Sequence, residues 1–226
     1  THNTGTDTIR TLTNAETVLI LGGSTLNVSL GGTNTGFLTA GGASAGTLNL
    51  NGGTLTNTGG VLTAANGGLI TQNSTTITGG ALNTSGSGVI RASNSAANIL
   101  NGVTLNGNLD LATATGIERV QGGLTLNGAI NVNNNSILAF QGNQTVGGTG
   151  NIVLGNTGSA NRVNLEAGDL TLGSGITLRG QNGTIGNQNF AGGAATLVNQ
   201  GVIAADVSGG TITLAVNGLT TNNGTL

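Results

Sequence analysis

The stretch LTLNGAINV, residues 124–132, shows most clearly the pattern that decides the fold. Leu124, Leu126, Ile130 and Val132 alternate with small or polar residues, which is typical of a strand with one buried face. An Asn-Gly turn signal divides the stretch into two halves. We therefore expect two short strands on either side of a corner, with Leu126 and Ile130 facing the core.

Similar phrases recur at residues 103–111 and 170–178, and they place Leu105 and Leu172 at the position of Leu126. The separations are 21 residues from Leu105 to Leu126 and 46 residues from Leu126 to Leu172. Turns of about 20 residues, with insertions at corners, fit both values. A looser unit at 52–56 is similar to residues 79–83. The repeats predict a β-solenoid of about ten turns and roughly 50 Å in length.

The composition favours this narrow coil over a compact globule. The 226 residues include 44 Gly and three Phe, with no Pro, Cys, Met, Trp or Tyr, and the net charge is -2. Small aliphatic side chains can fill a thin interior without the aromatic residues that usually fill a globular core. The absence of Cys excludes disulfides and thiolate metal sites. Scattered Arg residues and the absence of Lys argue against a nucleic-acid partner, and no apolar run is long enough for a membrane span.

The chain divides into two expected parts. Residues 1–16 contain the only His and several of the few charges, and we interpret them as an N-terminal cap or an inter-subunit arm. Residues 17–226 form the solenoid domain. Because Asn-Gly pairs also mark β-hairpins, an antiparallel β-sandwich is the alternative fold.

Two runs carry a family resemblance, TLNLNGGTLTNTGG at 47–60 and LAFQGNQTVGGTGNIVLGN at 138–156. They resemble the β-strand repeats of bacterial autotransporter passengers and of filamentous-haemagglutinin-type surface proteins. The resemblance implies a right-handed parallel β-helix that is secreted from a Gram-negative bacterium to the cell surface or the medium. It also implies a role in adhesion, biofilm or extracellular fibres. The implied partners are further copies of the chain, stacked head to tail, or glycans on host or neighbouring cells.

Candidate reactive residues are few. His2 lies near the chain terminus, where a solvated side chain is the ordinary expectation. Glu166 and Asp169, with Arg162 nearby, could form the carboxylate pair of a carbohydrate-active β-helix. A second loose charged group comprises Asp110, Glu118 and Arg119.

Because isolated ion pairs explain both charged groups more simply, we assign no catalytic, cofactor-binding or metal-ligating residue and no cofactor. We predict that the chain is not an enzyme. It is instead expected to be a secreted structural or adhesive solenoid, acting as a stalk or as a self-assembling fibre subunit. A carbohydrate-binding or carbohydrate-active β-helix is the alternative.

A further alternative concerns Thr residues on outward strand positions, since flat Thr arrays on solenoids resemble those of ice-binding proteins. The pairs recur at irregular intervals along the chain, namely Thr11 and Thr13, Thr54 and Thr56, Thr76 and Thr78, and Thr211 and Thr213. Thr is also simply a good strand residue. Ice binding therefore ranks behind the structural and carbohydrate hypotheses.

Overall fold

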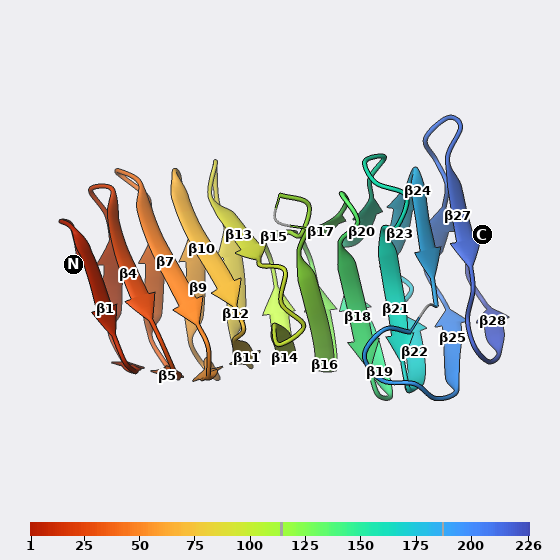
Figure 1. Ribbon diagram of the computed structural model, residues 1–226, viewed down its shortest axis with the longest axis horizontal. Coiled ribbons are helices and arrows are strands. Elements are labelled where there is room, and N and C mark those ends of the chain that lie inside the picture. The colour runs from red at the N-terminus through yellow and green to blue at the C-terminus, as the bar shows by residue number, and fades with distance from the viewer. Residues whose placement is uncertain (114, 187) are drawn as a thin grey trace.

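A computed structural model describes residues 1–113, 115–186 and 188–226 and shows an all-β fold. Throughout these ranges the regular elements are short strands, and every strand pairing is parallel. The expected β-solenoid is confirmed, and the antiparallel β-sandwich alternative is wrong. Figure 1 shows the turns stacked side by side along the long axis, with the two termini at opposite ends.

Each turn contributes one strand to each of three faces. The first face is a sheet of ten strands. Its members are β1 (Thr6–Ile9), β4 (Ser24–Val28), β7 (Gly46–Asn51), β10 (Gly68–Asn73), β13 (Val89–Ala92), β15 (Asn108–Asp110), β17 (Ala129–Val132), β20 (Asn151–Leu154), β23 (Thr177–Gly180) and β26 (Val202–Ala204).

The other two faces are joined into one sheet by two long strands, β14 (Ile99–Leu105) and β16 (Ile117–Leu126), which run across both. The second face also holds β2 (Leu12–Asn14), β5 (Gly31–Asn34), β8 (Thr54–Thr56), β11 (Thr76–Thr78), β18 (Ile137–Gln141), β21 (Arg162–Glu166), β24 (Asn182–Ile185) and β27 (Thr211–Leu214). The third face holds β3 (Thr17–Ile20), β6 (Phe37–Ala40), β9 (Val61–Ala64), β12 (Ala81–Thr84), β19 (Gln144–Gly148), β22 (Gly168–Leu172), β25 (Ala195–Asn199) and β28 (Thr220–Asn222).

The core consists of columns of aliphatic side chains that run along the rod. One column on the first face contains, in register order, Leu26, Leu48, Ile70, Ile90, Leu109, Ile130, Ile152, Leu178 and Ile203. All nine side chains are buried. Neighbours in the column are 19 residues apart from Ile90 to Leu109 and 26 apart from Ile152 to Leu178. The turn length is therefore close to the expected 20 residues, and corners absorb the variation.

The first two copies of the repeated phrase stack as expected. Leu105 lies beside Leu126, and Leu109 lies beside Ile130. Leu126 and Ile130 are both fully buried, which confirms the predicted core positions. The alternation of the phrase therefore identifies the inward side chains correctly.

The third copy lies two turns further on and is displaced by two residues from the expected register. Leu172 follows Val146, and Val146 follows Leu124, so Leu172 aligns with Leu124 and not with Leu126. The cause is the seven-residue corner 155–161 between β20 and β21. Because the displacement is an even number of residues, the inward side chains stay inward.

The looser repeat was aligned incorrectly. Leu55 in β8 pairs with Ile77 in β11, whereas Leu82 in β12 pairs with Leu62 in β9. Residues 52–56 and 79–83 therefore lie on different faces of the solenoid. Both segments contain a Gly-Gly corner followed by a buried Leu, and this shared local pattern does not distinguish one corner of the coil from another.

Asn-Gly corners serve two different purposes. Gly52, Gly67 and Gly102 have φ angles of 99°, 68° and 62°, which is the left-handed backbone that Gly accepts readily. Gly128 is required for a different reason, because a Cβ atom there would lie 1.9 Å from the carbonyl oxygen of Gly107 in the turn before. These corners direct the chain onto the next face and do not form hairpins.

Residues 1–16 contribute strands to the stack. β1 pairs with β4, and β2 pairs with β5, so this segment supplies the first two strands of the first turn. The expected boundary after residue 16 falls at the corner between β2 and β3. Its role as a cap or an arm stays a prediction.

Candidate functional site

His2 is held within the first turn. Its backbone N–H donates to the Leu19 oxygen, and its Nε2 lies 3.0 Å from the Thr25 oxygen. Its Nδ1 lies 3.4 Å from Oδ2 of Asp7. The imidazole therefore contacts one carboxylate and backbone groups at the end of the rod, where it ties the first residues to β3 and β4.

The structure does not bring Glu166 and Asp169 together as a reactive pair. Glu166 is fully buried at the end of β21, whereas Asp169 is exposed on β22. The Glu166 carboxylate accepts hydrogen bonds from Nδ2 of Asn164 at 3.0 Å and from the backbone N–H groups of Asn189, Phe190 and Ala191 at 2.7, 3.1 and 2.8 Å.

These four bonds use the acceptor capacity of both carboxylate oxygens. They fasten the corner after β24 over the outer side of the second face. Arg162 takes part indirectly, since its Nη1 donates to Oδ1 of Asn189 at 3.1 Å. The arrangement positions a loop and leaves Glu166 without a free lone pair directed at solvent.

The second charged group is also divided by the structure. Glu118 points into the core and is fully buried, while its neighbour Arg119 lies on the outer side. The Arg119 guanidinium donates to the Ala96 oxygen at 3.1 Å and to Oε1 of Gln141, and it lies 5.5 Å from the centre of the Phe190 ring. Phe190 therefore packs in a cation–π contact and does not belong to the core.

Asp110 forms an ion pair with Arg91 on the neighbouring strand, with Nε 3.2 Å from Oδ2. Burial raises the pKa of Asp110, but hydrogen bonds from Thr113 and the Arg91 partner outweigh burial and lower the pKa below its ordinary value. A similar pair joins Arg179 to Asp206 at 2.6 Å. These pairs are partly exposed, so each contributes little to stability.

The Thr pairs that recur irregularly in the sequence form a regular array in space. Thr54 and Thr56 lie beside Thr76 and Thr78 on adjacent strands of the second face. The column of Thr56 continues through Thr33 to Thr13 on the two preceding strands. Along a strand these side chains are about 6.6 Å apart, and between strands about 4.8 Å. Four consecutive turns therefore present hydroxyl and methyl groups on one outer face.

Thr211 and Thr213 do not belong to this array. They lie on β27 at the C-terminal end of the second face, where they line a shallow hollow of about 490 Å³ together with Asn156 and Asn182. The four pairs proposed from the sequence therefore separate into one array and one isolated pair.

The structure also reveals a ladder of buried Asn side chains that the sequence interpretation missed. Asn14 donates to Oδ1 of Asn34 at 2.7 Å, and Asn34 donates to Oδ1 of Asn57 at 2.6 Å. Asn34 and Asn57 are fully buried, and Asn14 nearly so. The repeated Thr-Asn dipeptides at 13–14, 33–34 and 56–57 are the sequence signal that could have identified the ladder.

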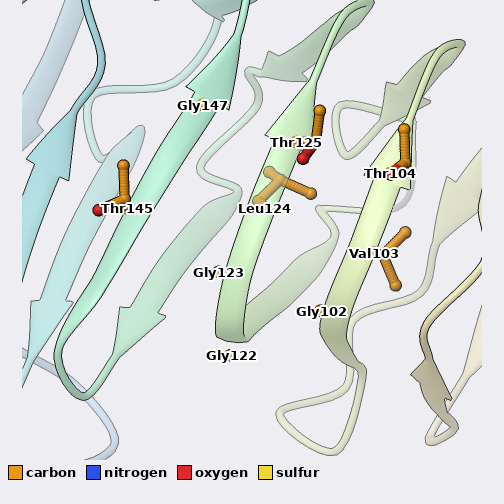
Figure 2. Close-up of a pocket in the computed structure, with 9 residues that line it drawn as sticks. All are labelled: Gly102, Val103, Thr104, Gly122, Gly123, Leu124, Thr125, Thr145 and Gly147. Atoms are coloured by element: carbon orange, nitrogen blue, oxygen red, sulfur yellow. The ribbon is translucent and has the colours of Figure 1, made fainter.

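Figure 2 shows an open hollow on the outer side of β14, β16 and β19, with a volume of about 330 Å³. Gly102, Gly122, Gly123 and Gly147 form much of its floor, because their missing side chains leave backbone exposed. Thr104 and Thr125 lie on neighbouring strands and point in the same direction (Figure 2). The lining supplies hydroxyl and backbone groups but no charged side chain, so it could hydrogen-bond only a neutral polar group.

The two ends of the rod differ in character. Asp7 on β1 stands in register with the buried Leu26, so a carboxylate occupies an inward column at the first turn. At the other end Leu214, Leu219 and Leu226 are exposed. Within residues 1–113, 115–186 and 188–226, no three His, Cys, Asp or Glu side chains come together as a metal site. The same ranges contain no helix that could cross a membrane.

Comparison of the chain with protein-family models, with curated protein sequences and with solved structures gave no match. The resemblance to autotransporter and haemagglutinin-type repeats therefore stays a prediction. What is established about this chain is its architecture, a parallel β-solenoid of three faces.

Proposed function

We propose that this chain is a non-enzymatic structural module, a stiff stalk or spacer that acts outside the cell. The observation that carries the proposal is the unbroken first face, in which ten parallel strands stack over one continuous column of buried aliphatic side chains. Such a stack behaves as a one-dimensional object in which each turn contacts only its neighbours. It spans about 50 Å from a single short chain.

The polar interior supports a mechanical role. The ladder from Asn14 to Asn57 links three successive turns through side-chain hydrogen bonds parallel to the rod axis. Glu166 serves to hold a corner in place, and the Arg91–Asp110 pair joins adjacent strands. The buried and paired polar side chains thus connect one part of the rod with another.

The ends of the rod favour a stalk over a head-to-tail fibre. A second copy stacked on β1 would bury Asp7, and burying a charge without a good partner is costly. We therefore interpret residues 1–16 as a cap and not as an inter-subunit arm. Adhesion, biofilm formation and binding of cell-surface glycans belong to the same proposal and rest on the family resemblance alone.

Electron microscopy of the purified 226-residue chain at near-physiological salt tests this assignment. Isolated rods about 50 Å long are expected, because the cap resists stacking. Asp7→Leu should favour end-to-end association, whereas Asp169→Leu, which places the same side chain on an outer face, should not. Long filaments of the unmodified chain would overturn the stalk and favour the self-assembling fibre subunit.

A second candidate function is ice binding, and the in-register Thr array favours it more than the sequence did. The spacing in sequence is irregular, yet the structure aligns Thr13, Thr33, Thr56 and Thr78 along consecutive strands. A flat lattice of hydroxyl and methyl groups could match a repeating solid surface. A soluble ligand of ordinary size would contact only part of it.

Growth of a single ice crystal in solutions of the chain tests this second candidate. Shaped or halted growth is expected from the unmodified chain, and Thr54→Lys with Thr56→Lys should abolish the effect. Thr25→Lys with Thr47→Lys is the matched control, since these residues form an outward in-register pair on the first face. Unmodified ice growth in the presence of the parent chain would remove ice binding from consideration.

A further inference from the structure

Two buried polar side chains meet in the core near the middle of the rod. Gln72 on β10 and Glu118 on β16 are both fully buried. Gln72 Nε2 donates to the Thr75 oxygen at 2.7 Å and to the Ile99 oxygen at 3.2 Å, and it lies 3.4 Å from Oε1 of Glu118. The two side chains belong to turns separated by one intervening turn. Ala92 follows Gln72 in register, and its small side chain leaves space for the contact.

Each side chain presents one oxygen without a partner. Within the described residues, Oε1 of Gln72 and Oε2 of Glu118 are buried and accept no hydrogen bond. An unpaired buried polar atom is costly, and native structures contain few of them. Both oxygens are acceptors when Glu118 is ionised. A single proton on Glu118 converts one of them into a donor.

We propose that Glu118 is a neutral carboxylic acid that donates its proton to Oε1 of Gln72, while Nε2 of Gln72 donates to Oε1 of Glu118. The result is an acid–amide pair closed by two hydrogen bonds. One proton thereby satisfies both of the oxygens that would otherwise be unpaired. The core then contains no charge at this level of the rod.

The surroundings of Glu118 support the neutral form. Neighbouring core side chains are apolar, with Leu100 on β14 and Leu138 on β18 fully buried. The charged groups on adjacent elements lie on outer positions, where Arg91 pairs with Asp110 and Arg119 contacts Gln141. Burial raises the pKa of Glu118 well above its ordinary value, and hydrogen bonds from Gln72 and from the Leu100 backbone offset this only in part.

Stability should consequently depend on pH in a defined direction. In the unfolded chain Glu118 has an ordinary pKa of about 4.3, whereas the folded chain retains the proton to higher pH. The contribution of the pair is complete below the unfolded pKa. It is lost as the pH rises through the folded pKa, because the unfolded state then binds fewer protons. Over that interval the unfolding equilibrium constant rises by up to about tenfold per pH unit.

The chain is well suited to a direct test, because it contains only Glu16, Glu118 and Glu166 as glutamates. With 13C at the side-chain carboxyl of Glu, the NMR spectrum contains three carboxyl signals. Glu118→Gln removes one signal and so assigns it. We expect that signal to have the chemical shift of a protonated acid at neutral pH and to titrate far above the signal of exposed Glu16.

Stability measurements complete the test. Glu118→Gln can form the same two hydrogen bonds as an amide–amide pair, so it should fold and lack the loss of stability between pH 5 and the folded pKa. Glu16→Gln is the matched control and should keep the pH dependence of the parent chain. A Glu118 signal typical of an ionised carboxylate at neutral pH would overturn the proposal, whether a water molecule or a cation then satisfied the two oxygens.

Discussion

At the scale of single residues, the molecule depends on whether a polar side chain faces the core or the solvent. Leu126 and Glu118 both lie on inward positions of β16, yet one is aliphatic and the other carries a carboxyl group. Glu166 is buried too, but its carboxylate has four hydrogen-bond donors around it. A buried carboxyl is therefore tolerated where the fold supplies either a proton or several N–H groups.

Leu126→Asp should remove this tolerance. The new carboxylate would enter a column of apolar side chains with no donor prepared for it, and we expect a loss of at least about 4 kcal/mol in the free energy of unfolding. Urea denaturation followed by circular dichroism measures the change. Thr125→Asp places the same charge on the exposed neighbouring position and should cost far less. Equal stability of Leu126→Asp and the parent chain would refute the inward placement.

Glu166→Gln should loosen the corner that covers the second face. The substitution replaces one acceptor oxygen by an NH₂ group, which then opposes the backbone N–H groups of Phe190 and Ala191 or Asn189. We expect a loss of about 1–3 kcal/mol and faster amide hydrogen exchange at residues 189–191. Glu16→Gln, on an exposed side chain, is the control. Unchanged exchange at these three residues would show that the loop is held by other contacts.

At the scale of elements, the strands are too short to be stable alone and are held by columns that cross many turns. The aliphatic columns supply most of the burial, and the Asn ladder satisfies backbone groups at the corner between the second and third faces. Asn34, for example, donates to the Gly36 oxygen as well as to Asn57. The corner would otherwise leave carbonyl groups without partners inside the rod.

Asn34→Ala should therefore cost more than the removal of an exposed Asn of the same kind. It leaves the amide of Asn14 and the oxygen of Asn57 unpaired in the core, and we expect a loss of about 2–4 kcal/mol. Asn49→Ala is the matched control, because Asn49 donates to Asn27 at 2.9 Å in an outward ladder. Comparable losses in thermal or urea unfolding for the two variants would contradict the structural importance of the buried ladder.

At the scale of the whole molecule, the rod lacks the single centre that a globular core provides. Each turn is stabilised only by the turns on either side, so stability should decrease toward the ends. The C-terminal strands β27 and β28 are largely exposed, whereas the inward residues of β16 and β18 are buried. The ends should therefore open more often than the middle.

Native-state hydrogen exchange can reveal this gradient. We expect amides of β27 and β28 to exchange fastest among the strands, and amides of β16 and β18 to exchange close to the limit set by global unfolding. The slowest amides should also become faster above the folded pKa of Glu118 if the acid–amide pair is present. Uniform exchange along the rod would indicate that the solenoid unfolds as one cooperative unit.

The sequence by itself determined the strand alternation, the inward positions of Leu105, Leu126 and Ile130, and the repetitive parallel coil. These follow from short-range patterns, because a period of two residues shows which side chains share a face. The tertiary structure alone decided the stacking of Leu55 on Ile77, the displaced register of the third phrase, and the burial of Glu118 and Glu166. Register depends on the lengths of corners in intervening turns. The environment of a carboxylate depends on residues more than twenty positions away, such as Gln72 for Glu118 and Asn189 for Glu166.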